Sequence, residues 1–306
     1  MKGDIKLKKF TKPLVLLSLV LVLILTFTGC SNKTTGANKG GTSQSTDDGD
    51  SVENGLSGTI NIVGSTSVTP MAESLSEEFS KLNKDVKMNV QGVGSTAGIK
   101  ASIDGTADIG MSSRNLKDEE KSTGIREYTI AYDGIVVVVH PNNTVSDLDM
   151  ETIQKIFKGE ITNWKDLGGK DEEILIVSRE DGSGTRGAFE EILNLQEKDS
   201  SGNTLSTIKK DALIADGNGS VKANISRKEN SIGYISLSYL DDTVKGLKVE
   251  GVEATVESIQ KGEYKVSRPF FMLTMGEESE VVKEFLAFIL SDEGQKIVGE
   301  KQVPVN

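Results

Sequence analysis

The sequence predicts an α/β protein. From about residue 58 to the C-terminus, short apolar segments of strand length alternate with stretches in which apolar residues recur every three or four positions. The 306 residues suffice for two domains, and 36% hydrophobic with 26% charged residues suits a chain that folds around a core in water. We therefore expect mostly parallel sheets, with a ligand site at the carboxyl ends of the strands.

The first 29 residues are typical of a secretion signal. Five lysines between Lys2 and Lys12 precede the apolar run Leu14–Phe27, whose 14 residues are too few for a comfortable transmembrane helix. The run ends at Cys30, the only cysteine, so the pattern resembles a bacterial lipobox, although Phe27 stands where Leu is usual. An ordinary signal peptide or an uncleaved anchor is the alternative. Residues 1–29 carry a net charge of +4, so a mature chain without them would carry −15 instead of −11.

Residues 30–55 are expected to be a lipidated Cys30 followed by a disordered tether. Seventeen of the 25 residues in 31–55 are Gly, Ser, Thr, Asn or Gln, and hardly any residue there is apolar. Such a segment cannot bury a core. It would hold a folded body near a membrane.

In the folded body, apolar patterns predict elements in a regular order. Alternating or continuous apolar segments indicate strands, and the spacing of Met71, Leu75 and Phe79 indicates a helix opened by Thr69 and Pro70. The expected strands are 58–63, 86–90, 107–111, 125–131, 135–139, 174–178, 232–235 and 269–275. The expected helices are 69–82, 95–103, 150–157, 184–193, 221–227, 278–290 and 292–298.

Three of the expected strand-to-helix loops carry the same chemistry: Gly64–Ser67, Gly92–Thr96 and Asp181–Thr185. Each offers hydroxyl groups, backbone N–H groups and the positive end of a helix dipole, and its glycine lets the backbone approach a ligand. A single Gly-Ser loop is usually an ordinary turn. The repetition at three strand ends predicts an anion-binding site.

Two arginines stand near these loops. Arg114 follows Ser113 at the end of an expected strand, and Arg179 precedes the third loop. The guanidinium fork matches the paired oxygens of an anion, and Asp181 is placed to hold the fork of Arg179. A surface salt bridge is the alternative role for either arginine.

Composition and spacing exclude several other kinds of site. One Cys and one His exclude a disulfide framework, multi-Cys metal sites and His-rich zinc sites, so we expect no metal and no cofactor. The net charge of −11 argues against a nucleic-acid partner. Gly92-x-Gly94 is followed by glycine at 98 instead of 97, so that loop does not match the GxGxxG fingerprint, and the spacings GxxxxGK[ST] and GxSxG are absent. His140 is the only histidine, so a Ser-dependent hydrolase using Ser183 is the less favoured alternative.

Several segments together resemble the phosphate-binding lipoproteins of Pst-type ABC transporters. The match runs in order from about Gly58 to the C-terminus, and it is the combination that is specific. The segments that carry it are Gly64–Pro70, Gly92–Ile99, Asp108–Arg114 and Ser178–Arg186, together with Tyr132–Val138 and Ile232–Ile235.

The resemblance implies a two-lobe periplasmic-binding-protein fold, whose hinge-linked lobes close on phosphate in the cleft between them. Lobe I would comprise residues 56–134 plus 239–306, and lobe II residues 135–238. Phosphate-binding roles are implied for Thr66, Ser67, Ser95, Arg179, Ser183, Gly184 and Thr185, with support from Ser65, Asp133 and Asp181.

One position departs from the family. Some members have an Asp where this chain has Ser113, and that carboxylate accepts the proton of hydrogen phosphate but repels sulfate. The Ser113 hydroxyl can accept the proton but repels sulfate far less. We hypothesise weaker discrimination, or an acceptor supplied by Asp133 or Asp181. Arg114, beside Ser113, is expected to add charge to the phosphate site.

The resemblance thus implies an extracytoplasmic solute-binding protein that captures inorganic phosphate and delivers it to the permease subunits of an ABC importer. It would be no enzyme, and it would act as a monomer. Lipid on Cys30 would anchor it to the outer face of the cell membrane. Binding of another tetrahedral oxyanion, such as sulfate or molybdate, is the alternative that hydroxyl-rich loops leave open.

Overall fold

The structure is a computed structural model that describes residues 55–306. The expected signal segment, the lipidation site Cys30 and nearly all of the tether lie outside the described residues. Residues 55–306 lie within one compact unit. In residues 55–306, no helix combines the length and the apolar character needed to cross a membrane.

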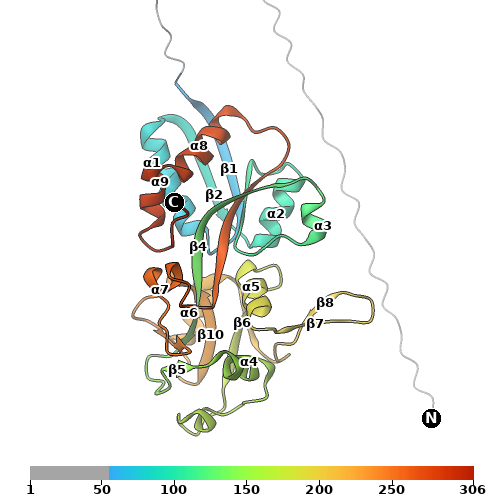
Figure 1. The fold of residues 1–306 in the computed structure, drawn as a ribbon, viewed down its shortest axis with the longest axis vertical. Helices are drawn as coiled ribbons and strands as arrows, with labels where there is room; N and C mark the ends of the chain where they lie inside the picture. Colours follow the sequence, from blue (N-terminus) through green and yellow to red (C-terminus); the bar gives the residue numbers. More distant parts are fainter. Residues whose placement is uncertain (1–54) are drawn as a thin grey trace, which may run out of the picture. The chain divides into compact units, whose positions relative to one another are not determined.

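The elements group around two hydrophobic cores joined by β4 (Arg126–Val139) and β13 (Ser267–Thr274) (Figure 1). The first lobe is formed by β1 (Ser57–Gly64), α1 (Thr69–Leu82), β2 (Asp85–Gly92), α2 (Ser95–Ile103), β3 (Ile109–Ser112), α3 (Asp118–Lys121), α8 (Glu280–Leu290) and α9 (Asp292–Val298). The second is formed by β5 (Asp147–Leu148), α4 (Met150–Lys158), β6 (Leu175–Arg179), α5 (Gly184–Ile192), β7 (Gln196–Lys198), β8 (Thr204–Ser206), β9 (Leu213–Ala215), α6 (Gly217–Ile225), β10 (Ser231–Ser236), β11 (Lys245–Gly246), β12 (Lys248–Val249) and α7 (Val256–Gln260).

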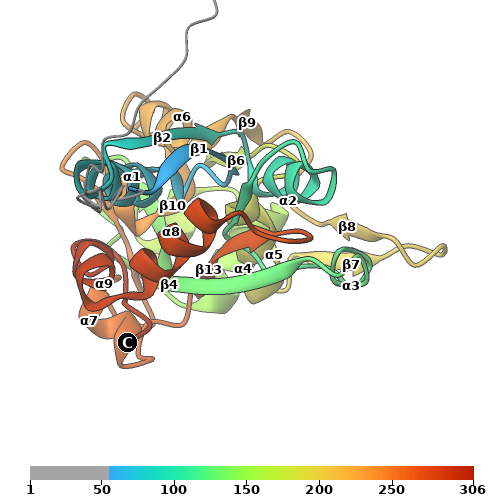
Figure 2. The same cartoon turned by 90° about the horizontal axis from the view of Figure 1, so that it is seen from above.

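The main sheet has nine strands in the order β2-β1-β3-β13-β4-β10-β6-β9, with β11 paired to β4. β1 runs parallel to β2 and β3, and β6 runs parallel to β9 and β10. β4 runs antiparallel to both β10 and β13. The expectation of mostly parallel sheets is therefore wrong at the centre, because β4 and β13 run antiparallel where they cross between the lobes (Figure 1). Figure 2, the view from above, shows the antiparallel pair β7 and β8 extending away from the rest of the fold.

The two strands expected at 125–131 and 135–139 are one continuous strand, β4. Its first half pairs with β13, and its second half pairs with β10 and β11. Ile130 and Ala131 belong to the first core, whereas Ile135 and the four valines after it belong to the second. The change of core falls at residues 132–134.

Side-chain alternation on β13 shows how the first lobe is layered. Phe270 and Met272 pack in the core with α1 and α8, while Phe271 and Leu273 pack against Ile99 of α2 on the other face. Helices therefore cover both faces of this sheet.

The C-terminal part of the chain is divided between the lobes. Val244, Leu247, Tyr264 and Val266 all pack in the second core. The sequence analysis assigned residues 239–306 to the first lobe. The packing instead leaves the chain in the second lobe until β13, where it returns to the first.

Candidate anion-binding site

The carboxyl ends of strands from both lobes meet at one place. β1, β2 and β3 are parallel, so their ends lie at the same edge, and β6 and β9 likewise end together. The helices α1, α2, α5 and α6 follow these strand ends after a few residues at most. Their N-termini supply backbone N–H groups and positive dipole ends to the region between the lobes.

The first predicted loop meets the third across this region. The hydroxyls of Ser67 and Thr185 lie 2.8 Å apart, although they come from different lobes. Both side chains are buried, at 0% and 1% exposure. Tyr239 of the second lobe also donates its hydroxyl to the carbonyl oxygen of Thr66, at 2.9 Å. The structure therefore brings the predicted residues Thr66, Ser67 and Thr185 together.

The second loop and the end of β3 form the neighbouring part of the cluster. The Ser65 hydroxyl donates to Ser113 Oγ at 2.8 Å, and the Ser113 backbone N–H donates to Ser95 Oγ at 3.1 Å. Gly184 of the other lobe lies against them. A Cβ on Gly184 would lie 2.1 Å from Ser95 Oγ, so only glycine permits this approach. Ser183 begins α5, and its hydroxyl accepts from the Arg186 N–H.

Arg179 lies in this cluster, with a side chain only 1% exposed. It donates through Nη2 to Thr66 Oγ1 (3.2 Å) and through Nη1 to Thr185 Oγ1 (3.4 Å). Glu180 holds the guanidinium from the other side, with two contacts of 2.7 Å. Burial raises the pKa of Glu180, but the hydrogen bond and charge of Arg179 outweigh burial and hold that pKa below its ordinary value.

Two sequence expectations about charged groups are corrected by this geometry. Asp181 does not brace Arg179: its side chain is 95% exposed and pairs with Arg186 at 2.6 Å. Arg114 is held by Glu120 through two hydrogen bonds of 2.8 Å, which balance its charge, and its Nη2 also donates to Thr96 Oγ1 of the second loop at 3.1 Å. Neither contact could be read from the sequence, since each depends on local side-chain direction.

A second arginine, which the sequence analysis missed, lies beneath the hydroxyls. Arg268 Nη2 donates to Ser67 Oγ and to Asp133 Oδ2, both at 3.0 Å, and Nη1 donates to the Ser113 carbonyl at 3.1 Å. Asp133 also accepts from the Ser236 hydroxyl at 2.9 Å. Burial raises the pKa of Asp133 to about 6, against the opposing effect of Arg268. A lone arginine at the start of the apolar segment 269–275 was the available signal.

Asn218 is the other residue that the sequence analysis missed. It lies near the N-terminus of α6 with 1% exposure, and its Nδ2 donates to Ser67 Oγ at 2.9 Å. Its Oδ1 accepts from the Ser236 N–H at 3.0 Å. The segment Gly217–Ser220 resembles the three predicted loops in composition, and α6 begins there rather than at residue 221.

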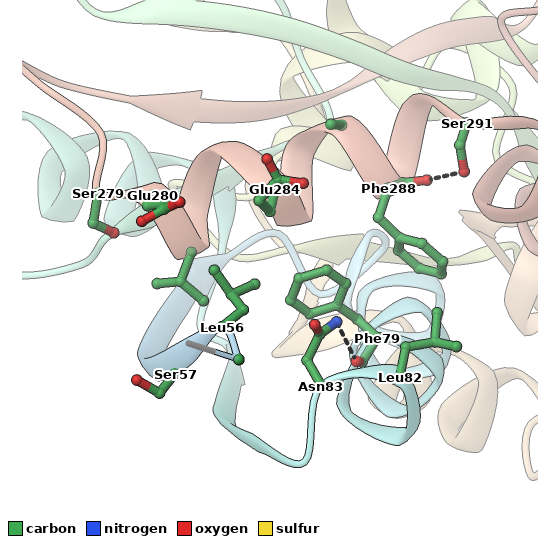
Figure 3. Close-up of a pocket in the computed structure, with 13 residues that line it drawn as sticks. Leu56, Ser57, Phe79, Leu82, Asn83, Ser279, Glu280, Glu284, Phe288 and Ser291 are labelled. Carbon is green, nitrogen blue, oxygen red and sulfur yellow. Dashed lines mark hydrogen bonds between the residues drawn. The ribbon is translucent and has the colours of Figure 1, made fainter. Parts of the chain in front are cut away.

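Two surface grooves have very different relations to this cluster. One, of about 890 Å³, is lined by residues of both lobes, among them Thr96, Arg114 and Ser183, and so lies in the cleft between them. The other, also about 890 Å³, lies between α1 and α8 near Phe79 and Phe288 (Figure 3). None of the predicted anion ligands lines that second groove.

The geometry does not favour nucleophilic catalysis by Ser183. Asp133 lies at the cluster, and His140 directly follows the end of β4, seven residues after Asp133 and roughly 23 Å away at strand spacing. His140 Nδ1 accepts from the Asn142 N–H. Within residues 55–306, no group of three or more His, Cys, Asp or Glu residues is arranged to hold a metal ion. What the cluster offers is N–H and O–H donors, which suit an oxyanion.

Comparison with known proteins agrees with this arrangement. A family model described as a PBP superfamily domain matches residues 42–293. The phosphate-binding protein PstS of Bacillus subtilis is 31% identical over 297 residues, covering 95% of this chain and 94% of its own. The chain belongs to the PstS family of the periplasmic-binding-protein superfamily. A PstS of Borreliella burgdorferi is also 31% identical, over 79% of this chain and 88% of its own.

Two solved structures of similar proteins support the PstS-family fold. A phosphate ABC transporter substrate-binding protein from Clostridium perfringens, crystallised with bound phosphate, has 46% identity and a TM-score of 0.77. It covers 81% of this chain and 100% of its own. An ABC-type phosphate transport receptor from Vibrio cholerae has 36% identity and a TM-score of 0.68 at the same coverage. The expected two-lobe fold is thus confirmed, and the family is one of transport receptors rather than enzymes.

Proposed function

We propose that this chain captures inorganic phosphate between its lobes and delivers it to the permease subunits of an ABC importer. One observation carries the proposal: a buried cluster of hydroxyls, helix N-termini and Arg179, contributed by both lobes. Phosphate-binding relatives of high coverage support it. The ligand residues would be Thr66, Ser67, Ser95, Ser113, Arg179, Ser183, Gly184 and Thr185, with Ser65, Asn218, Arg268 and Asp133 behind them.

The mechanism is closure on the ligand. Contacts across the cleft, such as Tyr239 to Thr66 and the Thr96 N–H to the Gly182 carbonyl (3.1 Å), hold the lobes together. An anion that receives donors from both lobes binds the closed form more tightly than the open form, so it shifts the equilibrium toward closure. A net charge of −11 does not prevent this, because local dipoles and arginines dominate in the cleft.

The lobes in this proposal follow the cores, except that Val303 near the C-terminus packs with the second core. The first would comprise residues 56–134 plus 267–306, and the second residues 135–266, which moves the second boundary from 239. Lipid on Cys30 would tether this body as a monomer to the outer face of the cell membrane, within reach of the permease. The small-residue site before Cys30 and the polar segment 31–55 support the anchor.

Calorimetry of the full chain with phosphate, arsenate, sulfate and molybdate tests the proposal. Saturable phosphate binding at one site, lost or much weakened in Arg179→Met, is expected. Binding of molybdate or sulfate with phosphate excluded would instead assign the site to another tetrahedral oxyanion. Mass spectrometry of the membrane fraction tests the lipid on Cys30.

A further inference from the structure

In two hydroxyl groups of the candidate site, both lone pairs of the oxygen accept hydrogen bonds from N–H donors. Thr66 Oγ1 accepts from Arg179 Nη2 at 3.2 Å and from Asn218 Nδ2 at 3.3 Å. Ser67 Oγ accepts from Arg268 Nη2 at 3.0 Å and from Asn218 Nδ2 at 2.9 Å. A hydroxyl oxygen has two lone pairs, so both hydroxyls can only donate to any further partner.

The occupied lone pairs determine which hydroxyl donates in the hydrogen bond between Ser67 and Thr185. Because the lone pairs of Ser67 are occupied, Ser67 is the donor in its 2.8 Å contact with Thr185. Thr185 Oγ1 then accepts from Ser67 and from Arg179 Nη1, so its own hydroxyl hydrogen must point to another partner. Toward a ligand, Thr66 and Thr185 therefore present donors only, and Ser67, whose hydrogen and both lone pairs are engaged, presents no acceptor.

The side formed by Ser95 and Ser113 is different. Ser113 Oγ accepts from Ser65, and Ser95 Oγ accepts from the Ser113 N–H. The two oxygens lie 3.3 Å apart, and either can donate to the other. Whichever one donates, one hydrogen and one lone pair remain for a ligand. This pair is therefore both donor and acceptor.

The donors behind the first side are themselves held in place. The Ser236 N–H donates to Asn218 Oδ1, so the Asn218 amide must direct its Nδ2 toward the hydroxyls. Arg268 is fixed by Asp133, and Arg179 by Glu180, each through two hydrogen bonds. Each arginine is already paired with a carboxylate, which balances its charge. Selection between anions therefore depends also on whether each hydroxyl group donates or accepts, and not on charge alone.

We propose that Asn218 and Arg268 are positioning residues that set ligand orientation: they make Ser67 donate to Thr185, so unprotonated oxygens face the Thr66 and Thr185 hydroxyls, and a P–OH group must face Ser95 and Ser113. The proposal rests on the proposed function, and it names the form of anion the site takes. A dianion with one hydroxyl satisfies both sides. A dianion without a hydroxyl leaves the acceptor of the Ser95–Ser113 pair unused.

The test compares the full chain's affinities for phosphate, fluorophosphate and sulfate at pH 8. Fluorophosphate keeps three unprotonated oxygens but replaces the P–OH by P–F, which cannot donate. Phosphate is expected to bind about tenfold more tightly than fluorophosphate, the worth of one hydrogen bond. In the double variant Ser95→Ala/Ser113→Ala this ratio should fall to about one, whereas Ser67→Ala should weaken all three anions and keep the ratio.

A third variant tests Asn218 itself. Adding Asn218→Leu to the double variant removes one of the two N–H donors at each of Thr66 and Ser67, which frees one lone pair on each hydroxyl to accept the P–OH. The phosphate preference should return to several-fold, which a purely structural role of Asn218 would not produce. A double variant that keeps the tenfold ratio, or a triple variant that stays near one, overturns the proposal. Absence of any phosphate binding to the wild-type chain would overturn the proposed function instead.

Discussion

Asp133 and Arg268 lie directly opposite each other on β4 and β13, where both strands pass from one core to the other. Asp133 Oδ2 and Arg268 Nη2 are 3.0 Å apart, with side chains 0% and 2% exposed. Arg268 Nη2 also reaches Ser67 Oγ. The ion pair therefore connects the crossing strands to the hydroxyls of the candidate site.

Removing one member of this pair should destabilise the protein strongly. Arg268→Met leaves the Asp133 carboxylate buried without its cation, and we expect a loss of about 3–5 kcal/mol in the free energy of unfolding. Asp133→Asn in the same chain removes that charge and should recover at least half of the loss. Urea unfolding of the three proteins measures this, and equal stability of the single and double variants would contradict it.

The pKa of Asp133 predicts how stability changes with pH. Burial raises it from 3.8 to about 6 in the folded protein. Between these values the folded state holds a proton that the unfolded state has lost, so the contribution of Asp133 to stability falls as pH rises through that window. The wild-type stability relative to Asp133→Asn should therefore decrease from about pH 4 to pH 6 and then stay level. A relative stability that rises with pH would show that Arg268 lowers this pKa instead.

Gly184 should be required for closure and not for folding. Its substitution by Ala puts a Cβ 2.1 Å from Ser95 Oγ and 2.6 Å from Ser113 Oγ, both in the other lobe. Overpacking of this kind costs about 1–3 kcal/mol, so phosphate should bind about tenfold to a hundredfold more weakly. The urea midpoint should hardly change, since the lobes can separate. The matched control is Gly219→Ala, whose Cβ meets nothing within 4 Å, and it should keep full affinity.

Glu180, rather than Asp181, should support anion binding by Arg179. Glu180→Gln weakens the two contacts of 2.7 Å that orient the guanidinium, and we expect a fivefold to tenfold loss of phosphate affinity. Asp181→Asn removes only an exposed ion pair with Arg186, which should change affinity less than twofold. The reverse order of effects in titration calorimetry would restore the role that the sequence suggested for Asp181.

The sequence predicted those parts of the fold that local patterns determine. Helical spacing located α1 and α8. Each of the three Gly-Ser loops follows a strand and leads into a helix, α1, α2 or α5. It could not predict that β4 is continuous, because the polar residues between its two apolar halves form the hydrogen-bonded crossing with β13.

Long-range contacts explain what was missed at the site. The Ser67–Thr185 contact spans 118 residues, and that of Ser67 with Arg268 spans 201. The local signals at Arg268, which begins an apolar segment, and at Asn218, which stands in a Gly-rich loop, do not place either residue at the site, since each acts through a partner far away in the chain. Conversely, Arg114 and Asp181 were expected at the site because they stand beside it in sequence, yet their partners Glu120 and Arg186 are close neighbours.

Titration of the full chain with inorganic phosphate, in parallel with Arg179→Met, tests the central claim most directly. We predict one saturable site in the wild-type chain, displaced by excess arsenate, and a loss of at least tenfold in affinity in the variant. Equal heats for the two proteins, or no phosphate binding to the wild-type chain, would contradict the claim that this interlobe cluster is a phosphate site.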